Sequence, residues 1–232
     1  MTSVTYEERR NALETYFDRT AVEAWAKLTS EAPVSGVRAT VRAGRDAIRD
    51  TILSWLPQDM ADEAVLDAGC GAGQLAFAMA ARGAVIEAVD LSPTLLDLAA
   101  ERAPAELRER VRFRAGDMLD PHGGPVDRVV AMDSVIHYQP DDMADMIAGL
   151  ASRAQEQVIF TFAPRTPALT VMHAAGKLFP KSDRSPAIVP VSEKGLRRRI
   201  EAHPDLQDWR VARTRRIDSF FYISQAMELV RA

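Results

Sequence analysis

Glycines and one acidic residue follow the first long apolar run of the sequence. The stretch VLDAGCGAGQ (65–74) carries Gly69, Gly71 and Gly73 in a G-x-G-x-G spacing, with Asp67 two residues before the first glycine. Glycines in a loop that leads into a helix let the backbone approach a ligand closely. The spacing is not the G-x-G-x-x-G of dinucleotide sites. A carboxylate here suits a ligand that brings positive charge better than one that brings a pyrophosphate.

Three more acidic residues follow the later apolar runs. Asp90 ends the stretch AVD, 21 residues after the first glycine of the loop. A carboxylate at that place can accept both hydroxyls of an unmodified ribose. Asp117 follows a glycine after the third run, and Asp133 follows the fourth. Glycines alone are weak evidence, but the loop and the acids together are a strong signal for a nucleoside ligand. The alternative for Asp67 and Asp117 is that they cap local turns.

The stretch AMDSVIHYQP (131–140) adds a histidine and a tyrosine just beyond Asp133. Ligands of open α/β sheets bind outside the carboxyl ends of the strands. His137 is therefore a candidate for the group that faces the reactive part of the ligand.

Such residues can meet only if their strands end at one edge of a sheet. Short apolar runs alternate with helical patterns, and the runs are continuous rather than alternating, as in parallel sheets covered on both faces. We expect strands at 64–68, 84–89, 111–115, 126–132 and 157–162, helices at 74–82, 93–103 and 141–153, and a last helix near 192–202 followed by strands at 209–214 and 220–230. This order predicts an α/β fold, a doubly wound seven-stranded Rossmann-like sheet.

The segments around the sheet complete the predicted organisation. Residues 1–60 form an N-terminal helical cap of two amphipathic helices, separated by a Pro/Gly stretch at 33–36. Residues 61–232 form the domain with the sheet, which includes a substrate-side insert at about 163–205.

Composition limits the class of protein. The chain has 232 residues, 47% of them hydrophobic, and a net charge of −4. This acidic balance argues against general nucleic-acid binding, which calls for a basic footprint. Cys70 is the single cysteine, which excludes an internal disulfide and fits a reducing compartment, so we expect a cytoplasmic protein. We predict no signal peptide and no transmembrane segment.

The glycine loop and the strand-end acids resemble the class I S-adenosylmethionine-dependent methyltransferases over roughly residues 61–165. The cofactor of that class is cationic at its sulfonium and ammonium groups, which would explain the acids. The resemblance implies that Asp67 and the 69–73 backbone hold the methionine moiety, that Asp90 holds the ribose, and that Asp133 lies near the methionine end. It implies these cofactor-binding residues: Asp67, Gly69, Cys70, Gly71, Gly73, Asp90, Leu91, Asp117, Met118 and Asp133, the pair Asp117–Met118 at the adenine. We expect Cys70 to pack inside the loop rather than act as a nucleophile, and we predict no protein-bound metal.

A closer resemblance covers nearly the whole chain. The stretches ETYFDRTAVEAW (14–25), MDSVIHY (132–138), FTFAPRTPALTVMHAAGKLFP (160–180) and TRRIDSFFYISQAMELVRA (214–232) resemble the magnesium-protoporphyrin IX O-methyltransferases. That family methylates one propionate of the porphyrin in chlorophyll and bacteriochlorophyll synthesis. The chain departs from the family's usual pattern in TAVEAW (20–25) and in RSPAIVP (184–190), which concerns the packing of the cap and the tip of the insert.

The charge of the insert fits such a substrate. Residues 163–200 contain eight Lys or Arg and two Asp or Glu in an otherwise acidic protein. This bias would favour a dianionic porphyrin, and the interleaved apolar residues would suit its flat ring. We predict Arg165, Lys177 and Lys181 as substrate-binding residues. The alternative, which we favour for the cluster 197–199, is a solvated basic helix face.

The expected chemistry needs little machinery. A propionate has a pKa near that of Glu, about 4.3, and is already an anionic nucleophile at neutral pH. His137 is predicted to orient that carboxylate or to take a residual proton, and Tyr16 to give a second hydrogen bond; the resemblance implies a role for both. Tyr16 also lies on an apolar helix stripe, where the alternative is a core residue. His173 is a weaker candidate, as an axial ligand of the porphyrin magnesium.

Two rival functions stay open at this point. One is a class I methyltransferase acting on another small-molecule acceptor, and the other is a carrier that holds a ligand without reaction. The family also suggests peripheral contact with the photosynthetic membrane and transfer of the substrate from the magnesium chelatase large subunit.

Overall fold

The computed structural model describes residues 4–19, 36–120, 123–165 and 187–232. Its helices are α1 (Val4–Arg19), α3 (Gly36–Trp55), α4 (Gln74–Ala80), α5 (Pro93–Arg102), α6 (Pro140–Ala151) and α8 (Glu193–Ala202), with short 3-10 turns at Ala105–Leu107 and Pro204–Leu206. Its strands are β1 (Ala64–Ala68), β2 (Val85–Asp90), β3 (Val111–Ala115), β4 (Val126–Ala131), β5 (Ala154–Phe162), β6 (Trp209–Ser219) and β7 (Tyr222–Arg231).

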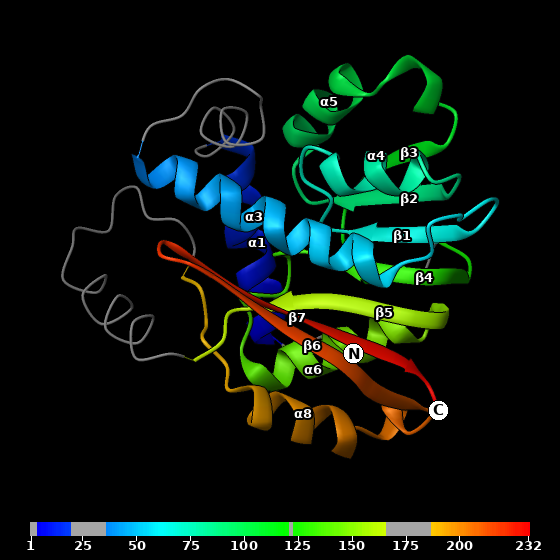
Figure 1. Ribbon diagram of the computed structural model, residues 1–232. Helices are drawn as coiled ribbons and strands as arrows, with labels where there is room; N and C mark the ends of the chain where they lie inside the picture. The colour runs from blue at the N-terminus through cyan, green and yellow to red at the C-terminus, as the bar shows by residue number, and fades with distance from the viewer. Residues whose placement is uncertain (1–3, 20–35, 121–122, 166–186) are drawn as a thin grey trace.

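The strands form one seven-stranded sheet in the order β3-β2-β1-β4-β5-β7-β6. Neighbours among β1 to β5 are parallel, and β7 runs antiparallel to both β5 and β6. The strand order reverses beside β1, so the carboxyl ends of β1 and β4 flank the place where ligands bind in such sheets. The predicted doubly wound seven-stranded fold is confirmed (Figure 1).

Both faces of the sheet are apolar, which explains why its strands read as continuous hydrophobic runs. In β5, Val158 and Phe160 pack into the core on the side of α6 and α8, while Ile159 between them packs into the core on the side of α3 and α4. Side chains alternate between the faces of a strand, so each face needs its own set of apolar residues.

Most predicted elements match the structure within two residues, and the C-terminal hairpin differs most. β6 continues to Ser219, five residues beyond the predicted end, and Phe220 lies in the turn with φ of +53° rather than in a strand. β6 is an edge strand whose outward side chains are mostly exposed and basic. Edge strands carry charge in this way, so the apolar pattern that marks a strand is missing there.

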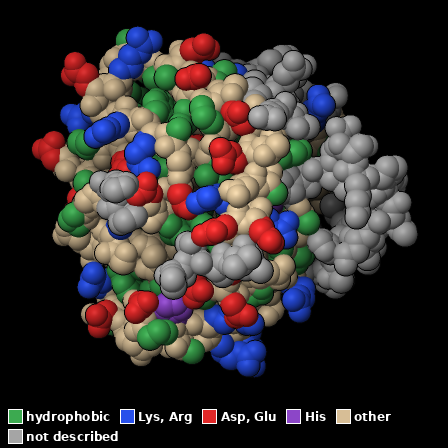
Figure 2. Space-filling view, turned by 180° about the vertical axis from the view of Figure 1, so that it is seen from behind, with side chains coloured by type: hydrophobic (Ala, Val, Ile, Leu, Met, Phe, Trp, Pro, Cys, Tyr) green, Lys and Arg blue, Asp and Glu red, His purple; other side chains and the backbone are tan. Residues whose placement is uncertain are grey.

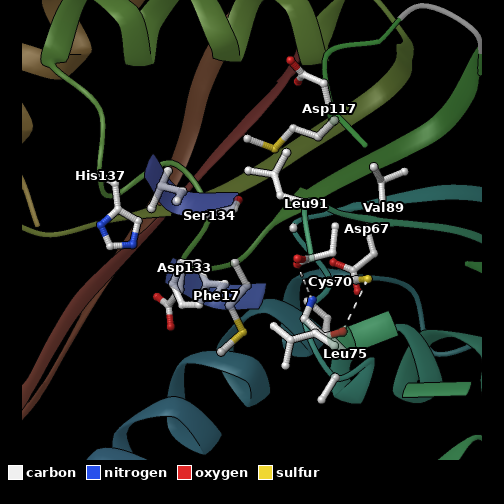
Figure 3. A pocket seen from close by; sticks show the side chains of 18 of the residues that line it. Phe17, Asp67, Cys70, Leu75, Val89, Leu91, Asp117, Asp133, Ser134 and His137 are labelled. Atoms are coloured by element: carbon white, nitrogen blue, oxygen red, sulfur yellow. Dashed lines mark hydrogen bonds between the residues drawn. The ribbon is translucent and has the colours of Figure 1, made fainter. Parts of the chain in front are cut away.

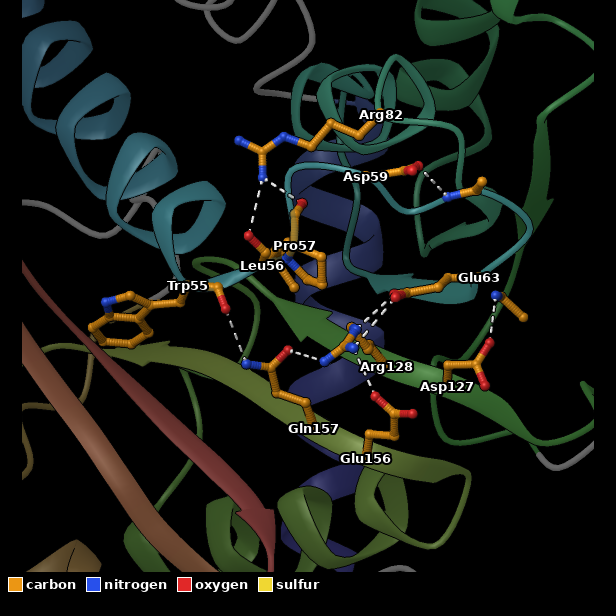
Figure 4. Close-up of polar contacts among 12 residues, drawn as sticks. Trp55, Leu56, Pro57, Asp59, Glu63, Arg82, Asp127, Arg128, Glu156 and Gln157 are labelled. Carbon is orange, nitrogen blue, oxygen red and sulfur yellow. Dashed lines mark hydrogen bonds and ion pairs between the residues drawn. The ribbon is translucent and has the colours of Figure 1, made fainter.

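The C-terminal end of α3 is anchored on the sheet domain (Figure 4). Arg82 donates to the carbonyl oxygens of Leu53 at 2.6 Å and Pro57 at 3.0 Å, and Gln157 donates to that of Trp55 at 3.3 Å. The last carbonyls of a helix have no partner inside the helix, and these side chains supply one. This anchoring fixes α3 across the sheet, where it packs against β6 and β7 (Figure 1).

On the face seen from behind in Figure 2, basic and acidic side chains are interspersed. No helix among the described residues is long and apolar enough to cross a membrane.

Candidate active site

The loop between β1 and α4 requires its glycines. Gly69, Gly71 and Gly73 have φ of +83°, +53° and +77°, in the left-handed region that favours glycine. A Cβ on Gly69 would overlap that of Ser134, and one on Gly73 would lie 2.9 Å from the ring of Phe77. The first two glycines line a cavity, whereas Gly73 lies just outside it as the N-cap of α4.

Asp90 ties the end of β2 to this loop. Its carboxylate accepts from the backbone nitrogen of Gly71 at 2.8 Å and from that of Ser92 at 3.0 Å. Burial raises the pKa of Asp90, and these backbone donors oppose the rise. The carboxylate also lines the cavity, where its predicted role is to accept hydrogen bonds from a ribose.

Asp67 is the most deeply buried acid of the site, with 1% of its surface exposed. Among the described residues nothing donates a hydrogen bond to its Oδ2. Burial, and then the charge of Asp90, raise the pKa of Asp67 to about 7. A cation that enters the cavity would relieve this cost, because an opposite charge nearby favours the ionised carboxylate. The cavity therefore fits the cationic methionine end of S-adenosylmethionine.

Cys70 lines the same cavity as these two acids. Burial of the thiol, and then the charges of Asp67 and Asp90, raise the pKa of Cys70 well above its ordinary value. A thiol that stays protonated is a poor nucleophile, which agrees with the predicted packing role.

Residues of the N-terminal helix α1 bind the Asp117 carboxylate, a contact that no sequence motif indicated. Tyr6 donates to its Oδ1 at 2.6 Å, and Arg10 forms an ion pair with its Oδ2 at 3.1 Å. The ring of Tyr6 also stacks on that of Tyr138, with centroids 5.2 Å apart. At the other end of α1, Asp18 accepts from the hydroxyl of Thr94 at 2.7 Å. The helix α1 is thus fixed across the side of the cavity that Asp117 lines, where the family resemblance predicts the adenine.

His137 is buried at the wall of the cavity, beyond the end of β4 (Figure 3). Its Nδ1 lies 3.5 Å from the carbonyl oxygen of Ala187, and its ring lies 6.1 Å from that of Phe17 on α1. An imidazole held in an apolar wall, with one nitrogen near a backbone carbonyl, is suited to present its other nitrogen to a ligand.

The cavity has a volume of about 1060 Å³, part of it open to solvent. Ten of the twelve predicted cofactor and catalytic residues line it, and Gly73 and Tyr16 do not. The lining comprises Tyr6, Leu13, Phe17, Arg45, Arg49, Asp67, Gly69, Cys70, Gly71, Ala72, Gln74, Leu75, Val89, Asp90, Leu91, Leu95, Gly116, Asp117, Met118, Met132, Asp133, Ser134, His137 and Tyr138.

Tyr16 lies near the cavity without lining it. It is half-buried on α1, and its ring meets that of Phe17 edge-on at 5.2 Å. Arg165 is exposed just after β5, and Lys177, Lys181 and His173 lie outside the described residues. The substrate-binding and catalytic assignments of these residues stay predictions.

Sequence reasoning missed the lining residues supplied by the cap. The helical spacing of Tyr6, Leu13 and Phe17 could have indicated that one face of α1 meets the cavity. Arg45 and Arg49 carry no such signal, because a basic residue on an amphipathic helix is usually solvated.

Glycine loop, strand-end acids and sheet order together define a class I S-adenosylmethionine-dependent methyltransferase. Residues 131–231 match the family model described as magnesium-protoporphyrin IX methyltransferase C-terminus, and residues 65–156 match the methyltransferase domain model. The chain belongs to the magnesium-protoporphyrin IX methyltransferase family.

Relatives support this over almost the full length. The magnesium-protoporphyrin O-methyltransferase of Rhodobacter capsulatus is 46% identical over 224 residues, which cover 96% of this chain and 97% of the relative. The chloroplastic magnesium protoporphyrin IX methyltransferase of Arabidopsis thaliana is 31% identical, covering 99% and 78%. The crystal structure of the enzyme from Synechocystis PCC 6803 with bound S-adenosylhomocysteine superposes with a TM-score of 0.84 at 29% identity, covering 96% of this chain and 100% of that one.

Proposed function

We propose that this protein methylates a propionate carboxylate of magnesium-protoporphyrin IX, with S-adenosylmethionine as the methyl donor, and releases the monomethyl ester. The observation that carries the proposal is the 46% identity to the Rhodobacter capsulatus enzyme over 96% of the chain. That similarity includes the cap and the C-terminal hairpin, which lie outside the methyltransferase domain match at 65–156. It therefore extends to the side of the cavity where an acceptor would bind.

The residues of the chain position the carboxylate relative to the methyl group and do not need to act as a strong base. When bound, the donor offers a methyl group on a cationic sulfur. The carboxylate oxygen forms a bond to the methyl carbon as the bond between this carbon and the sulfur breaks, and the electron pair of the broken bond stays on the sulfur. The acceptor is an anion at neutral pH, so the main requirement is alignment at roughly 3 Å. His137 orients the carboxylate or takes a residual proton, and Phe17 closes the wall beside it.

Recognition of the acceptor involves basic residues of the insert in this proposal. Arg165 begins the insert, where its backbone nitrogen donates to the carbonyl oxygen of Val191 at 2.9 Å. Lys177 and Lys181 would pair with the propionates, and Tyr16 would give the carboxylate a second hydrogen bond. Tyr16→Phe is expected to lower turnover about tenfold, the effect of one lost hydrogen bond to a charged group. Unchanged turnover would remove Tyr16 from the mechanism.

The test is transfer of label from methyl-labelled S-adenosylmethionine to magnesium-protoporphyrin IX, with the product separated by chromatography. The dimethyl ester of the same porphyrin is the matched control, because it keeps the ring and metal but has no free carboxylate. We expect monomethyl ester over many turnovers with the free acid and no transfer to the diester. Label in the diester, or none in either porphyrin while the donor binds, would overturn the proposal.

We also propose that the turn of the C-terminal hairpin contacts the membrane. Phe220 and Phe221 at this turn are 80% and 45% exposed. The turn lies at the carboxyl edge of the parallel strands, because β7 pairs antiparallel with β5, and Ser219 holds it to α3 by a hydrogen bond to Thr40. Exposed phenylalanine side chains at such a tip can bury their apolar surface at the edge of a lipid bilayer. Phe220→Ser with Phe221→Ser should abolish sedimentation with anionic vesicles, and undiminished sedimentation would refute the contact.

Transfer of the substrate from the magnesium chelatase large subunit is proposed on the family resemblance alone. Co-elution of the two purified proteins in the presence of the porphyrin would support it, and separate elution would refute it.

A further inference from the structure

Asp133 lies at a strained turn directly beyond β4. Its φ is +56°, in the left-handed region that favours glycine. The next residue, Ser134, packs so closely on Gly69 that a Cβ on that glycine would overlap it. Three residues further on, the chain reaches His137. The conformation of this single residue therefore sets where the loop 134–138 lies over the glycine loop.

The Asp133 carboxylate is held by donors from three other elements. Arg45 of α3 forms an ion pair with Oδ2 at 2.6 Å, and the hydroxyl of Tyr222 of β7 lies 3.0 Å from Oδ1 and 2.9 Å from Oδ2. Thr161 of β5 donates to Oδ1 at 3.2 Å and accepts from the Asp133 backbone nitrogen at 2.8 Å. The side chain is only 8% exposed. Both oxygens are thus bonded within the protein, which stabilises the strained turn.

Tyr222 is placed for this contact by a glycine on the facing helix. A Cβ on Gly44 would lie 2.5 Å from Cδ1 of the Tyr222 ring, so only glycine lets α3 and the hairpin approach this closely. Burial, and then the charge of Asp133, raise the pKa of Tyr222 well above its ordinary value. The phenol therefore stays protonated and able to donate over the working range of pH.

We propose that Asp133 is a positioning residue, and that Tyr222 and Arg45 act through it to set the place of His137 in the cavity. The C-terminal hairpin, far from the cofactor loop in sequence, would then control the alignment of methyl transfer. This differs from the predicted role of Asp133 as a cofactor ligand at the methionine end. The kinetic part of the inference rests on the proposed methyl transfer.

Tyr222→Phe is the sharpest variant, because it removes one hydroxyl and keeps the ring that fills the space beside Gly44. Replacing Asp133 or Arg45 would leave a buried charge without its partner and could unfold the protein. We expect the single-turnover rate of methyl transfer to fall about tenfold, since a small misplacement is costly for transfer. The Kd for S-adenosylmethionine should stay within about twofold of the wild-type value, because the Tyr222 hydroxyl bonds Asp133 and Tyr222 does not line the cavity.

Ser219→Ala is the matched control. It removes a 3.3 Å hydrogen bond between the same hairpin and the same helix, to the carbonyl oxygen of Thr40, without touching Asp133. Its rate should equal that of the wild type. In a His137→Ala background, Tyr222→Phe should cause no further loss, because both changes remove one function. Equal losses in Tyr222→Phe and Ser219→Ala, or a full tenfold further loss in the His137→Ala background, would overturn the proposal.

A measurement that needs no substrate separates this inference from the proposed function. The imidazole NMR signals of His137 should shift or broaden in Tyr222→Phe with S-adenosylhomocysteine bound, and should stay unchanged in Ser219→Ala. An unchanged His137 signal in Tyr222→Phe would refute the positioning role even if the porphyrin is methylated. If the porphyrin proves not to be the acceptor, the same shift would still support it.

Discussion

The two ends of the cavity are built in different ways. The end that we predict to hold the methionine and the ribose comes from contiguous motifs, the glycine loop and the acid that ends β2, which bond each other through Asp90 and Gly71. The wall around His137, where an acceptor would bind, depends instead on segments that are remote in sequence: Tyr222 is 89 positions from Asp133, whose turn leads to His137. A donor shared by a large class of enzymes can be held by a local motif, whereas the acceptor side depends on the assembled fold.

Asp90→Ala should cause the largest effect, at the local end. The change removes the ribose acceptor and the anchor of Gly71, two hydrogen bonds to a charged group worth together about 4 kcal/mol, so affinity for S-adenosylmethionine should fall about 1000-fold. Isothermal titration measures it, with Asp97→Ala, an exposed acid on α5, as the control. A loss below tenfold would mean that the motif does not hold the ribose.

His137→Ala should separate the two ends. Turnover should fall about 100-fold, the lower range for a positioned acid or base, while the Kd for S-adenosylmethionine stays within a few-fold. His203→Ala is the control, because His203 pairs with Asp145 at 3.2 Å, away from the cavity. If cofactor binding were lost together with turnover, His137 would belong to the cofactor end, and the division of the cavity into a donor end and an acceptor end would be wrong.

The pH dependence of cofactor binding should report Asp67. Burial raises its pKa to about 7 in the free protein, and the cationic cofactor favours the ionised form. The affinity for S-adenosylmethionine should therefore rise about tenfold from pH 6 to pH 8 and then level off. The Asp67→Asn variant should lack this tenfold rise, and any rise that it keeps comes from other groups. The raised pKa also makes the stability of the folded protein depend on pH. The protonated Asp67 side chain contributes fully to this stability below about pH 4, and the contribution is lost as the pH rises through 7. Identical pH profiles for the two proteins would contradict this.

Tyr6→Phe should have the smallest effect, at the side of the cavity where we predict the adenine. Its hydroxyl bonds Asp117 at 2.6 Å and helps fix α1 over the cavity. Loss of about 1 kcal/mol should weaken S-adenosylmethionine binding about fivefold and speed its dissociation, as stopped-flow fluorescence would record. Tighter binding would mean instead that Tyr6 competes with the adenine for Asp117.

The sequence could predict the parts of the site that come from contiguous motifs, but not the contacts between remote segments. The sheet, the glycine loop and the acids follow from apolar runs and spacing, and the acids do line the cavity. Sequence spacing could not bring Arg45 and Tyr222 to Asp133, since that contact depends on how α3 crosses the hairpin. It also gave no reason to prefer Tyr6 over Tyr16 as the tyrosine that lines the cavity, because both lie on the apolar side of one helix.

The most direct test of the account is a crystal structure of the protein with S-adenosylhomocysteine and magnesium-protoporphyrin IX bound together. We predict one propionate oxygen roughly 3 Å from the place of the transferable methyl, within hydrogen-bond distance of His137. The Asp133 carboxylate should keep its bonds to Arg45 and Tyr222. A porphyrin bound with both propionates far from His137, or Asp133 turned to the cofactor, would contradict the account.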